Sequence, residues 1–160
     1  MYSYYVLSVQ LHIRYKLVTY HCLTIKKNTT VDVIITLPTN LIQLIKDEKK
    51  TIELRKNRPL FFNPEEDVIY ICQKGTAKVV GYMKIDAVIS TRNKYNILTD
   101  WAKDIAVPLK WIENYIRNAK DLYGYFILYY REFDKPLSLR ENFKVYRAPQ
   151  SFAYTTEYIR

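Results

Sequence analysis

Apolar residues along the chain gather in short β-prone runs separated by polar turns, a pattern that predicts strands rather than long helices. One run ends at Pro38 and is nearly all β-branched, which is typical of a strand buried on both faces. Gly81 interrupts a longer run and predicts a bulge or a close approach of backbone. The strands predicted in this way are Val31–Leu37, Val68–Cys72, Ala77–Ser90 and Tyr125–Arg131.

A shorter run alternates strictly between apolar and polar residues. Ile52 and Leu54 alternate with Glu53 and Arg55, so an extended chain places the two pairs on opposite faces. One face can enter a core while the other presents a carboxylate beside a guanidinium. Pro59 lacks an N–H and should lie beyond the end of this strand.

Three stretches carry apolar residues at helical spacing. The first runs from Leu41 to about Asp47, with Thr39 or Asn40 as its cap. A second helix is predicted to start at Thr99-Asp100. A third should have Pro108 in its first turn.

The two ends of the chain are harder to interpret. Tyr4–Leu11 and Leu17–Ile25 are candidate strands of a hairpin, although no Gly or Pro marks a turn between them. Near the other end, Asp134-Lys135-Pro136 predicts a turn and Leu137–Leu139 a last short strand. The aromatic tail Tyr146–Phe152 is predicted to fold back onto the body.

The order of these elements is typical of an α+β protein without a repeated βαβ unit. A small, mixed, mainly antiparallel β-barrel with flanking helices is the most economical packing. The length of 160 residues fits one domain. We assign that domain to residues 31–160 and treat residues 1–30 as an N-terminal extension or an extra hairpin.

A formal charge of +9 and a pI near 9.4 favour a polyanionic partner, with RNA or another nucleic acid the natural choice. The abundance of Lys, Ile, Asn and Tyr also fits a biased genome composition, so charge alone leaves the question open. Hydrophobic residues make up 49% of the chain and charged residues 26%, which indicates a folded protein.

Cys22 and Cys72 are far apart and lack the spacing of a metal site or a disulfide scaffold. We therefore expect a cytoplasmic protein with no metal and no cofactor. His12 and His21 are isolated and more typical of structural positions. Charged residues interrupt the first stretch of the chain, so we expect neither a targeting segment nor a membrane partner.

The alternating strand and its surroundings resemble the ASCH domain family of the PUA-like superfamily. That family's motif has Gly, Lys, Glu and Arg at fixed spacing, and here it reads Glu48-Lys49-Lys50-Thr51-Ile52-Glu53-Leu54-Arg55. Lys50, Glu53 and Arg55 match, while Glu48 stands at the glycine position. Further agreement spans residues 31–152, at Val31–Leu37 with Pro38, Asp67–Ile71, Val79-Val80-Gly81, Gly124-Tyr125 and Ala148–Phe152.

The resemblance implies a barrel with a cleft beside the motif strand and a role in binding RNA. The residues expected to line a basic nucleic-acid site are Lys50, Glu53, Arg55, Lys56, Arg58, Arg147, Gln150 and Ser151. Glu53 would hold Arg55 so that its planar donors are aimed at phosphate or base. The plainer interpretation is a solvated strand face with a weak ion pair. Four tyrosines are candidates for stacking on bases: Tyr70, Tyr82, Tyr125 and Tyr154.

Some ASCH proteins resemble enzymes, which leaves a hydrolase on modified nucleosides or RNA as the alternative. In the amidohydrolases of N4-acetylcytidine, a Thr follows the motif Lys by three residues, and this chain has Glu53 there. That change removes the hydroxyl nucleophile. Lys50 and Glu53 remain the catalytic candidates, with Glu53 as a general base. A third hypothesis makes the basic, aromatic amino terminus a protein-contact or oligomerisation arm. Trp111 and Tyr115 are expected to be packing residues.

Overall fold

The computed structural model describes residues 31–155, so the hairpin and contact-arm predictions for residues 1–30 lie outside the described residues. Six strands form one sheet in the order β2-β5-β4-β3-β1-β6. Among the strands of the described residues, only the β1–β3 pair is parallel, which confirms a mixed, mainly antiparallel sheet. The strands are β1 (Asp32–Leu37), β2 (Ile52–Arg55), β3 (Ile69–Gln73), β4 (Lys78–Thr91), β5 (Leu122–Ser138) and β6 (Ala153–Thr155).

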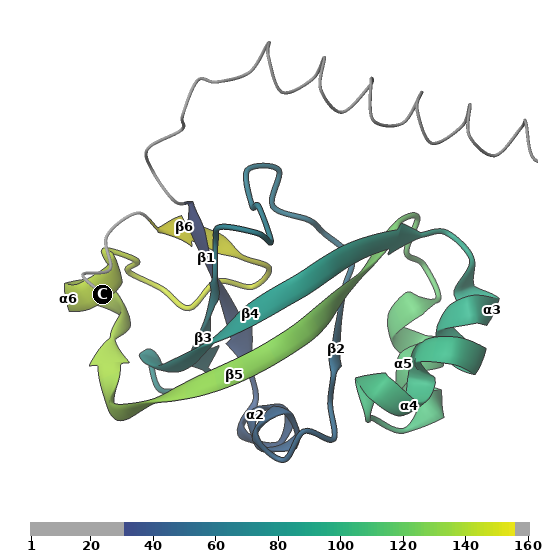
Figure 1. The fold of residues 1–160 in the computed structure, drawn as a ribbon, viewed down its shortest axis with the longest axis horizontal. Coiled ribbons are helices and arrows are strands. Elements are labelled where there is room, and N and C mark those ends of the chain that lie inside the picture. Colours follow the sequence, from purple (N-terminus) through teal and green to yellow (C-terminus); the bar gives the residue numbers. More distant parts are fainter. Residues whose placement is uncertain (1–30, 156–160) are drawn as a thin grey trace, which may run out of the picture.

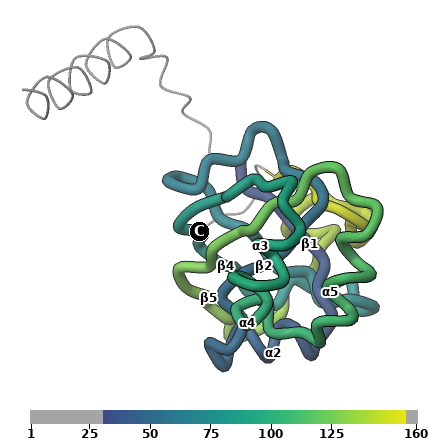
Figure 2. Tube along the Cα trace, turned by 90° about the vertical axis from the view of Figure 1, so that its right-hand side faces the viewer, coloured from purple at the N-terminus to yellow at the C-terminus, as the bar shows by residue number. Residues whose placement is uncertain are grey.

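The helices lie around the two long strands β4 and β5, which cross the whole molecule in Figure 1. Helices α3, α4 and α5 gather at one end and α6 at the other, and Figure 2 views the molecule from the first end. The helical elements are α2 (Thr39–Lys46), α3 (Lys94–Asn96), the π-helical turn η1 (Ile97–Trp101), α4 (Ala102–Ile105), α5 (Leu109–Ile116) and α6 (Leu139–Phe143).

Successive strand residues enter different cores, as the alternation of side chains along a strand requires. In β1, Val33 and Ile35 pack with α2, whereas Ile34 packs with α6. In β2, Ile52 and Leu54 pack with α4 and α5 in a third cluster. The strand predicted from Ile52 and Leu54 is therefore confirmed, together with the burial of its apolar face.

The predicted helix starts need correction. Helix α2 begins at Thr39 with Pro38 before it, and no side chain caps its first turn. The next helical segment begins at Lys94, because the Asn93 side chain accepts a hydrogen bond from the Tyr95 amide at 3.0 Å. Helix α5 begins one residue after Pro108.

Asp134-Lys135-Pro136 lies inside β5, so the predicted turn and the separate strand after it are wrong. The register with β4 jumps here: Gly81 pairs with Glu132, and Val79 pairs with Leu137. Residues 133–136 of β5 lie opposite Val80 alone, and this irregularity in the ladder accommodates a proline that has no N–H to donate. The bulge at Gly81 is confirmed, since a Cβ there would lie 2.3 Å from the Arg131 carbonyl oxygen.

The C-terminal tail folds back onto the body as predicted. β6 pairs antiparallel with β1, and Phe152 packs against the core that contains Val33. Within residues 31–155, none of the helices is long and apolar enough to cross a membrane. The same residues contain no cluster of His, Cys, Asp and Glu suited to a metal ion.

Candidate functional site

The site is built on the polar face of β2. Ile52 and Leu54 hold the strand against the helices, which fixes Glu53 and Arg55 on the opposite face. Glu53 is only 5% exposed, so its carboxylate has left bulk water. A buried carboxylate requires charged or hydrogen-bonding partners to remain ionised.

Lys50 supplies the first partner and is itself buried, with 2% of its surface exposed. Its Nζ lies 3.2 Å from Glu53 Oε2 and donates to the carbonyls of Ile52 at 2.7 Å and Ile105 at 3.1 Å. The Ile105 carbonyl ends α4, so the lysine also satisfies one of the open carbonyls at a helix C-terminus. An ammonium has three N–H groups, and these contacts use all three.

Arg55 supplies the second partner. Its Nη1 lies 3.5 Å from Glu53 Oε1, and its Nη2 donates to the Ser151 carbonyl. Asn57 Nδ2 also reaches the Ser151 hydroxyl, at 3.2 Å. Because β2 and β6 are the two edges of the sheet, these side chains connect one edge to the segment that leads into the other.

A small cavity lies against Glu53 and Arg55. It opens to solvent, and its volume of about 10 Å³ has room for about one water. Side chains from β1 to β5 all contribute to its wall, so the sheet curves around it. The lining residues are Val33, Ile35, Glu53, Arg55, Asn57, Pro59, Ile69, Met83, Tyr125 and Phe152.

Tyr125 forms one wall of this cavity. Burial raises the pKa of the Tyr125 phenol well above its usual range, while the positive charges of Arg55 and Arg58 act in the opposite direction. The neutral phenol donates to the Asn57 carbonyl at 3.3 Å. The tyrosine therefore ties β5 to the loop that follows β2.

The turn before β2 has a standard helix-ending geometry. The Glu48 amide donates to the Ile45 carbonyl at 3.0 Å, and the Lys49 amide donates to the Leu44 carbonyl at 2.9 Å. This pair of bonds is the Schellman motif, which places a left-handed residue after the helix. Glu48 has φ 57° and adopts that conformation without being glycine. The geometry that a glycine would favour is thus retained at the position where this chain departs from the motif.

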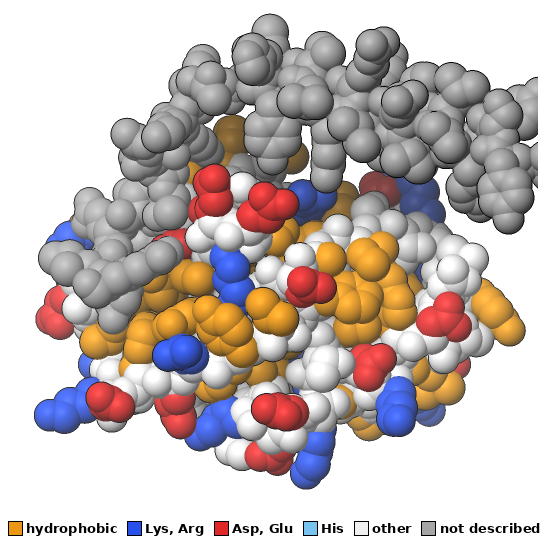
Figure 3. Space-filling model, in the orientation of Figure 1, with side chains coloured by type: hydrophobic (Ala, Val, Ile, Leu, Met, Phe, Trp, Pro, Cys, Tyr) orange, Lys and Arg blue, Asp and Glu red, His pale blue; other side chains and the backbone are white. Residues whose placement is uncertain are grey.

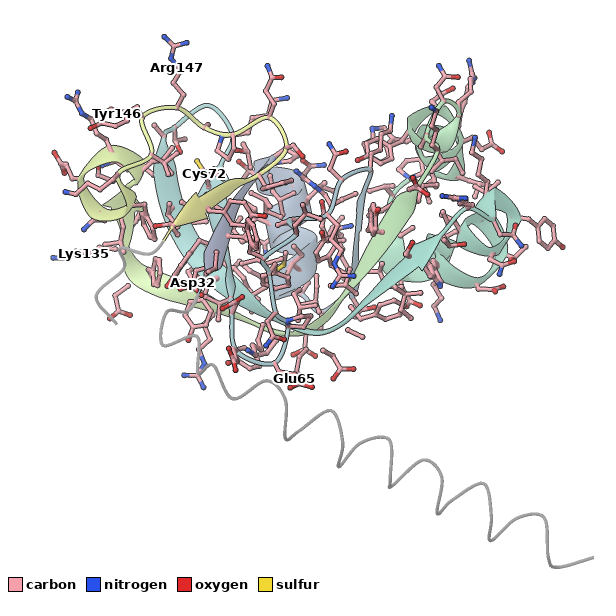
Figure 4. All side chains as sticks on the ribbon, turned by 90° about the horizontal axis from the view of Figure 1, so that it is seen from above. Asp32, Glu65, Cys72, Lys135, Tyr146 and Arg147 are labelled. Carbon is pink, nitrogen blue, oxygen red and sulfur yellow. The ribbon has the colours of Figure 1, made fainter. Side chains whose placement is uncertain are left out.

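The remaining predicted site residues differ in how they contact the site. Lys56 and Arg58 are exposed just beyond β2, and the Lys56 ammonium lies 4.6 Å from the centre of the Tyr115 ring. Ser151 joins the site through its carbonyl and hydroxyl. Arg147 and Gln150 are exposed in the loop before β6, and Arg147 points away from the body of the protein in Figure 4.

The sequence analysis named Tyr125 as a stacking candidate but did not assign Asn57 or Phe152 to the site. Asn57, Tyr125 and Phe152 meet only because three distant segments fold together, and no local pattern indicates such a meeting. The signals available for Phe152 were the aromatic content of the tail and the agreement of Ala148–Phe152 with the ASCH family. Tyr70 was a candidate for base stacking, but the structure buries it in the core near α6, where a base has no access.

The site contains three charged side chains in sequence, from Lys50 in the interior through Glu53 to Arg55 at the cavity. Buried Lys50 neutralises one side of Glu53, and Arg55 contacts the other side at the cavity. A guanidinium has five N–H groups, and the contacts to Glu53 and Ser151 leave donors for a ligand. The geometry suits a ligand with planar or anionic acceptors.

Charge elsewhere is less organised. On the face shown in Figure 3, the described acidic and basic side chains are interspersed, with broad hydrophobic areas between them. That part of the surface does not form a single basic field. The excess positive charge of the chain therefore does not by itself define a binding surface there.

The sequence matches no family model and no curated protein. The fold, in contrast, is similar to solved structures. The crystal structure of ASCH from Zymomonas mobilis covers 81% of this chain and 87% of its own, with TM-score 0.66 and 17% identity. A serine-to-alanine mutant of that protein gives TM-score 0.66, 16% identity and coverage of 81% and 88%. A tyrosine-to-phenylalanine mutant gives TM-score 0.66, 17% identity and coverage of 81% and 90%.

Proposed function

Because this chain has the fold of an ASCH protein, we propose that it is a nucleic-acid-binding module that prefers RNA to DNA. The single observation that carries the proposal is Arg55, held between Glu53 and the Ser151 carbonyl at the wall of a cavity. A guanidinium fixed in this way is aimed before the ligand arrives, which lowers the entropy cost of binding.

Lys56 and Arg58 extend the binding surface. Both are exposed beside Arg55, at the point where the chain leaves β2. Exposed cations at such a position can contact phosphates and release counterions without reading sequence. In this proposal Arg55 contacts a phosphate or the edge of a base at the opening of the cavity, and Lys56 and Arg58 hold the flanking backbone.

The proposal extends to the shape of the domain. The Arg55 and Asn57 contacts to Ser151 connect the region of β2 to that of β6, where no strand ladder is described within residues 31–155. We regard this connection as the closure of a small PUA-like barrel by side chains. On that view residues 31–160 form the binding domain and residues 1–30 are an addition to it.

Salt-dependent binding tests the proposal. Fluorescence anisotropy of a labelled single-stranded RNA should show affinity that falls steeply with salt. Replacing Lys56 and Arg58 with Ala together should reduce the slope of log affinity against log salt by about 0.7 for each lost phosphate contact. The matched control replaces Lys74 and Lys135, two cations that are exposed elsewhere. Binding that is absent, insensitive to salt, or equally reduced in the control would overturn the proposal.

A hydrolase acting on modified nucleosides or RNA is the second candidate. The observation that favours it is that the buried Glu53 carboxylate lines the cavity with Lys50 behind it. Such a carboxylate can act as a general base toward a bound ligand. Acetylated cytidine and single-stranded RNA should then be cleaved by the wild-type protein and spared by Glu53→Gln. The control is Glu132→Gln, at a surface ion pair with Lys46, and no turnover by the wild-type protein would exclude this candidate.

A further inference from the structure

Two aromatic side chains form a parallel stack on the outside of α5. Trp111 and Tyr115 lie one turn apart, with ring centres 5.0 Å apart and ring planes inclined by 8°. Ile112 and Ile116 bury the inner face of the same helix. Tyr115 packs partly against that core, whereas Trp111 is 48% exposed. The expectation that both are packing residues therefore holds for Tyr115 but not for Trp111.

A cation joins this stack to the site on β2. The Lys56 ammonium lies 4.6 Å from the Tyr115 ring centre, a distance suited to a cation–π contact. Lys56 directly follows Arg55, which contacts Glu53 at the cavity. Burial raises the pKa of the Tyr115 phenol, and the nearby charges of Arg55 and Glu53 also act on it. Two consecutive residues thus connect the cavity and the stack: Arg55 contacts Glu53 at the cavity, and Lys56 contacts the Tyr115 ring.

We propose that Trp111 and Tyr115 form a stacking platform for a base of single-stranded RNA whose phosphate contacts Lys56. This inference rests on the proposed function and names the form of RNA that the site takes. Every base has a π-face, so an exposed indole can bind a base of any sequence. A duplex hides these faces, which restricts the platform to unpaired nucleotides.

Charge favours RNA over a protein partner at this surface. Besides Lys56, exposed Lys110 lies on α5 and exposed Arg117 directly follows its last residue, while Glu113 is the only acidic residue within that helix. Arg117 Nη2 donates to Asn114 Oδ1 at 2.7 Å, so its guanidinium is held on the outer face of the helix. Cations around an exposed aromatic ring are the usual surroundings of a single-strand binding surface. A purely apolar partner would leave these cations without compensation.

The test compares Trp111→Leu with the wild-type protein in binding a short single-stranded oligoadenylate by fluorescence anisotropy. We expect affinity about 5- to 100-fold weaker, as for the loss of one stacked base. Trp111→Phe should retain most of the affinity because it keeps a ring. Tyr95→Leu is the control, since Tyr95 is an aromatic residue on α3 that is 71% exposed. An abasic oligomer with the same sugar–phosphate backbone should bind wild type and Trp111→Leu equally.

The outcomes separate this inference from the function on which it rests. Wild-type binding that is sensitive to salt but unchanged in Trp111→Leu overturns the platform and leaves the proposed function standing. No binding by the wild-type protein overturns both. A change in the sedimentation of the RNA-free protein on Trp111→Leu would assign the stack to contact between copies of this chain and overturn the platform. Circular dichroism of each variant checks that the fold is retained.

Discussion

Glu48 occupies the position after α2 at which a left-handed residue ends the helix. Its φ of 57° is unfavourable for a residue with a Cβ, by about 1–2 kcal/mol. The two hydrogen bonds of the turn, to Ile45 and Leu44, hold it there and bring the chain into β2. At the residue scale the motif specifies a conformation, and this chain reaches that conformation at some cost in stability.

Replacing Glu48 with Gly is expected to stabilise the protein by about 0.5–1 kcal/mol, because relief of the left-handed strain exceeds the flexibility that Gly adds to the unfolded chain. Urea unfolding measures the change. Glu48→Ala is the matched control, since it removes the same charge but keeps a Cβ. Equal stability of the two variants would show that the charge and not the backbone is responsible.

The Tyr130 hydroxyl is buried and has no hydrogen-bond partner among the described residues. We expect Tyr130→Phe to raise the free energy of unfolding by about 1 kcal/mol at neutral pH, because a buried unsatisfied group is removed. Burial also raises the pKa of Tyr130 to about 12, against about 10 for an exposed phenol. The unfolded chain therefore loses this proton first, and the stability of the wild-type protein should fall as pH rises from about 10 to 12.

The phenylalanine variant should lack that alkaline contribution. Its advantage over the wild-type protein, followed by chemical unfolding at several pH values, should therefore grow above pH 10. Tyr129→Phe is the control, because Tyr129 is the exposed neighbour of Tyr130 on β5. An equal effect at both positions would contradict the role of burial.

At the element scale, β2 is held by charge as well as by apolar packing. Lys50 joins the strand to the end of α4 through the Ile105 carbonyl and to Glu53 through an ion pair. Thr51 adds a backbone bond, its amide donating to the Asp104 carbonyl at 2.9 Å. These contacts place the polar face of β2 at the cavity.

Lys50→Met should destabilise the fold by about 3–5 kcal/mol, because it leaves Glu53 buried beside Arg55 alone. Adding Glu53→Leu should recover a large part of that loss, since the uncompensated charge is then gone. Thermal unfolding of the two single variants and the double variant measures the coupling. Additive losses would show that the ion pair contributes nothing specific.

For the whole molecule, features that depend on local sequence could be predicted, whereas features that depend on contacts between distant segments could not. The alternation of Ile52 and Glu53 predicted the faces of β2, because that pattern is local. The long strand β5 was divided at Pro136, because proline usually ends a strand and only the pairing with β4 shows the bulge. The contact between Arg55 and Ser151 spans 96 residues, and no local signal indicates it.

The same distinction applies to the candidate site. Lys50, Glu53 and Arg55 were identified from their match to the motif of the ASCH family, and the structure brings them together. The depth of Lys50 could not be predicted, because its burial depends on α4 closing over it. Trp111 shows the opposite case, since it was expected to be a packing residue while the fold leaves it half-exposed.

In the proposed function, Arg55, aimed by Glu53, binds RNA at the cavity. The most direct measurement is the affinity of single-stranded RNA for Arg55→Lys, which keeps the charge but loses the planar fork of donors. We predict binding roughly 10- to 100-fold weaker than for the wild-type protein, with the fold unchanged. Arg131→Lys is the control, at an arginine exposed on β5. Wild-type affinity in Arg55→Lys, or an equal loss in Arg131→Lys, would contradict the claim.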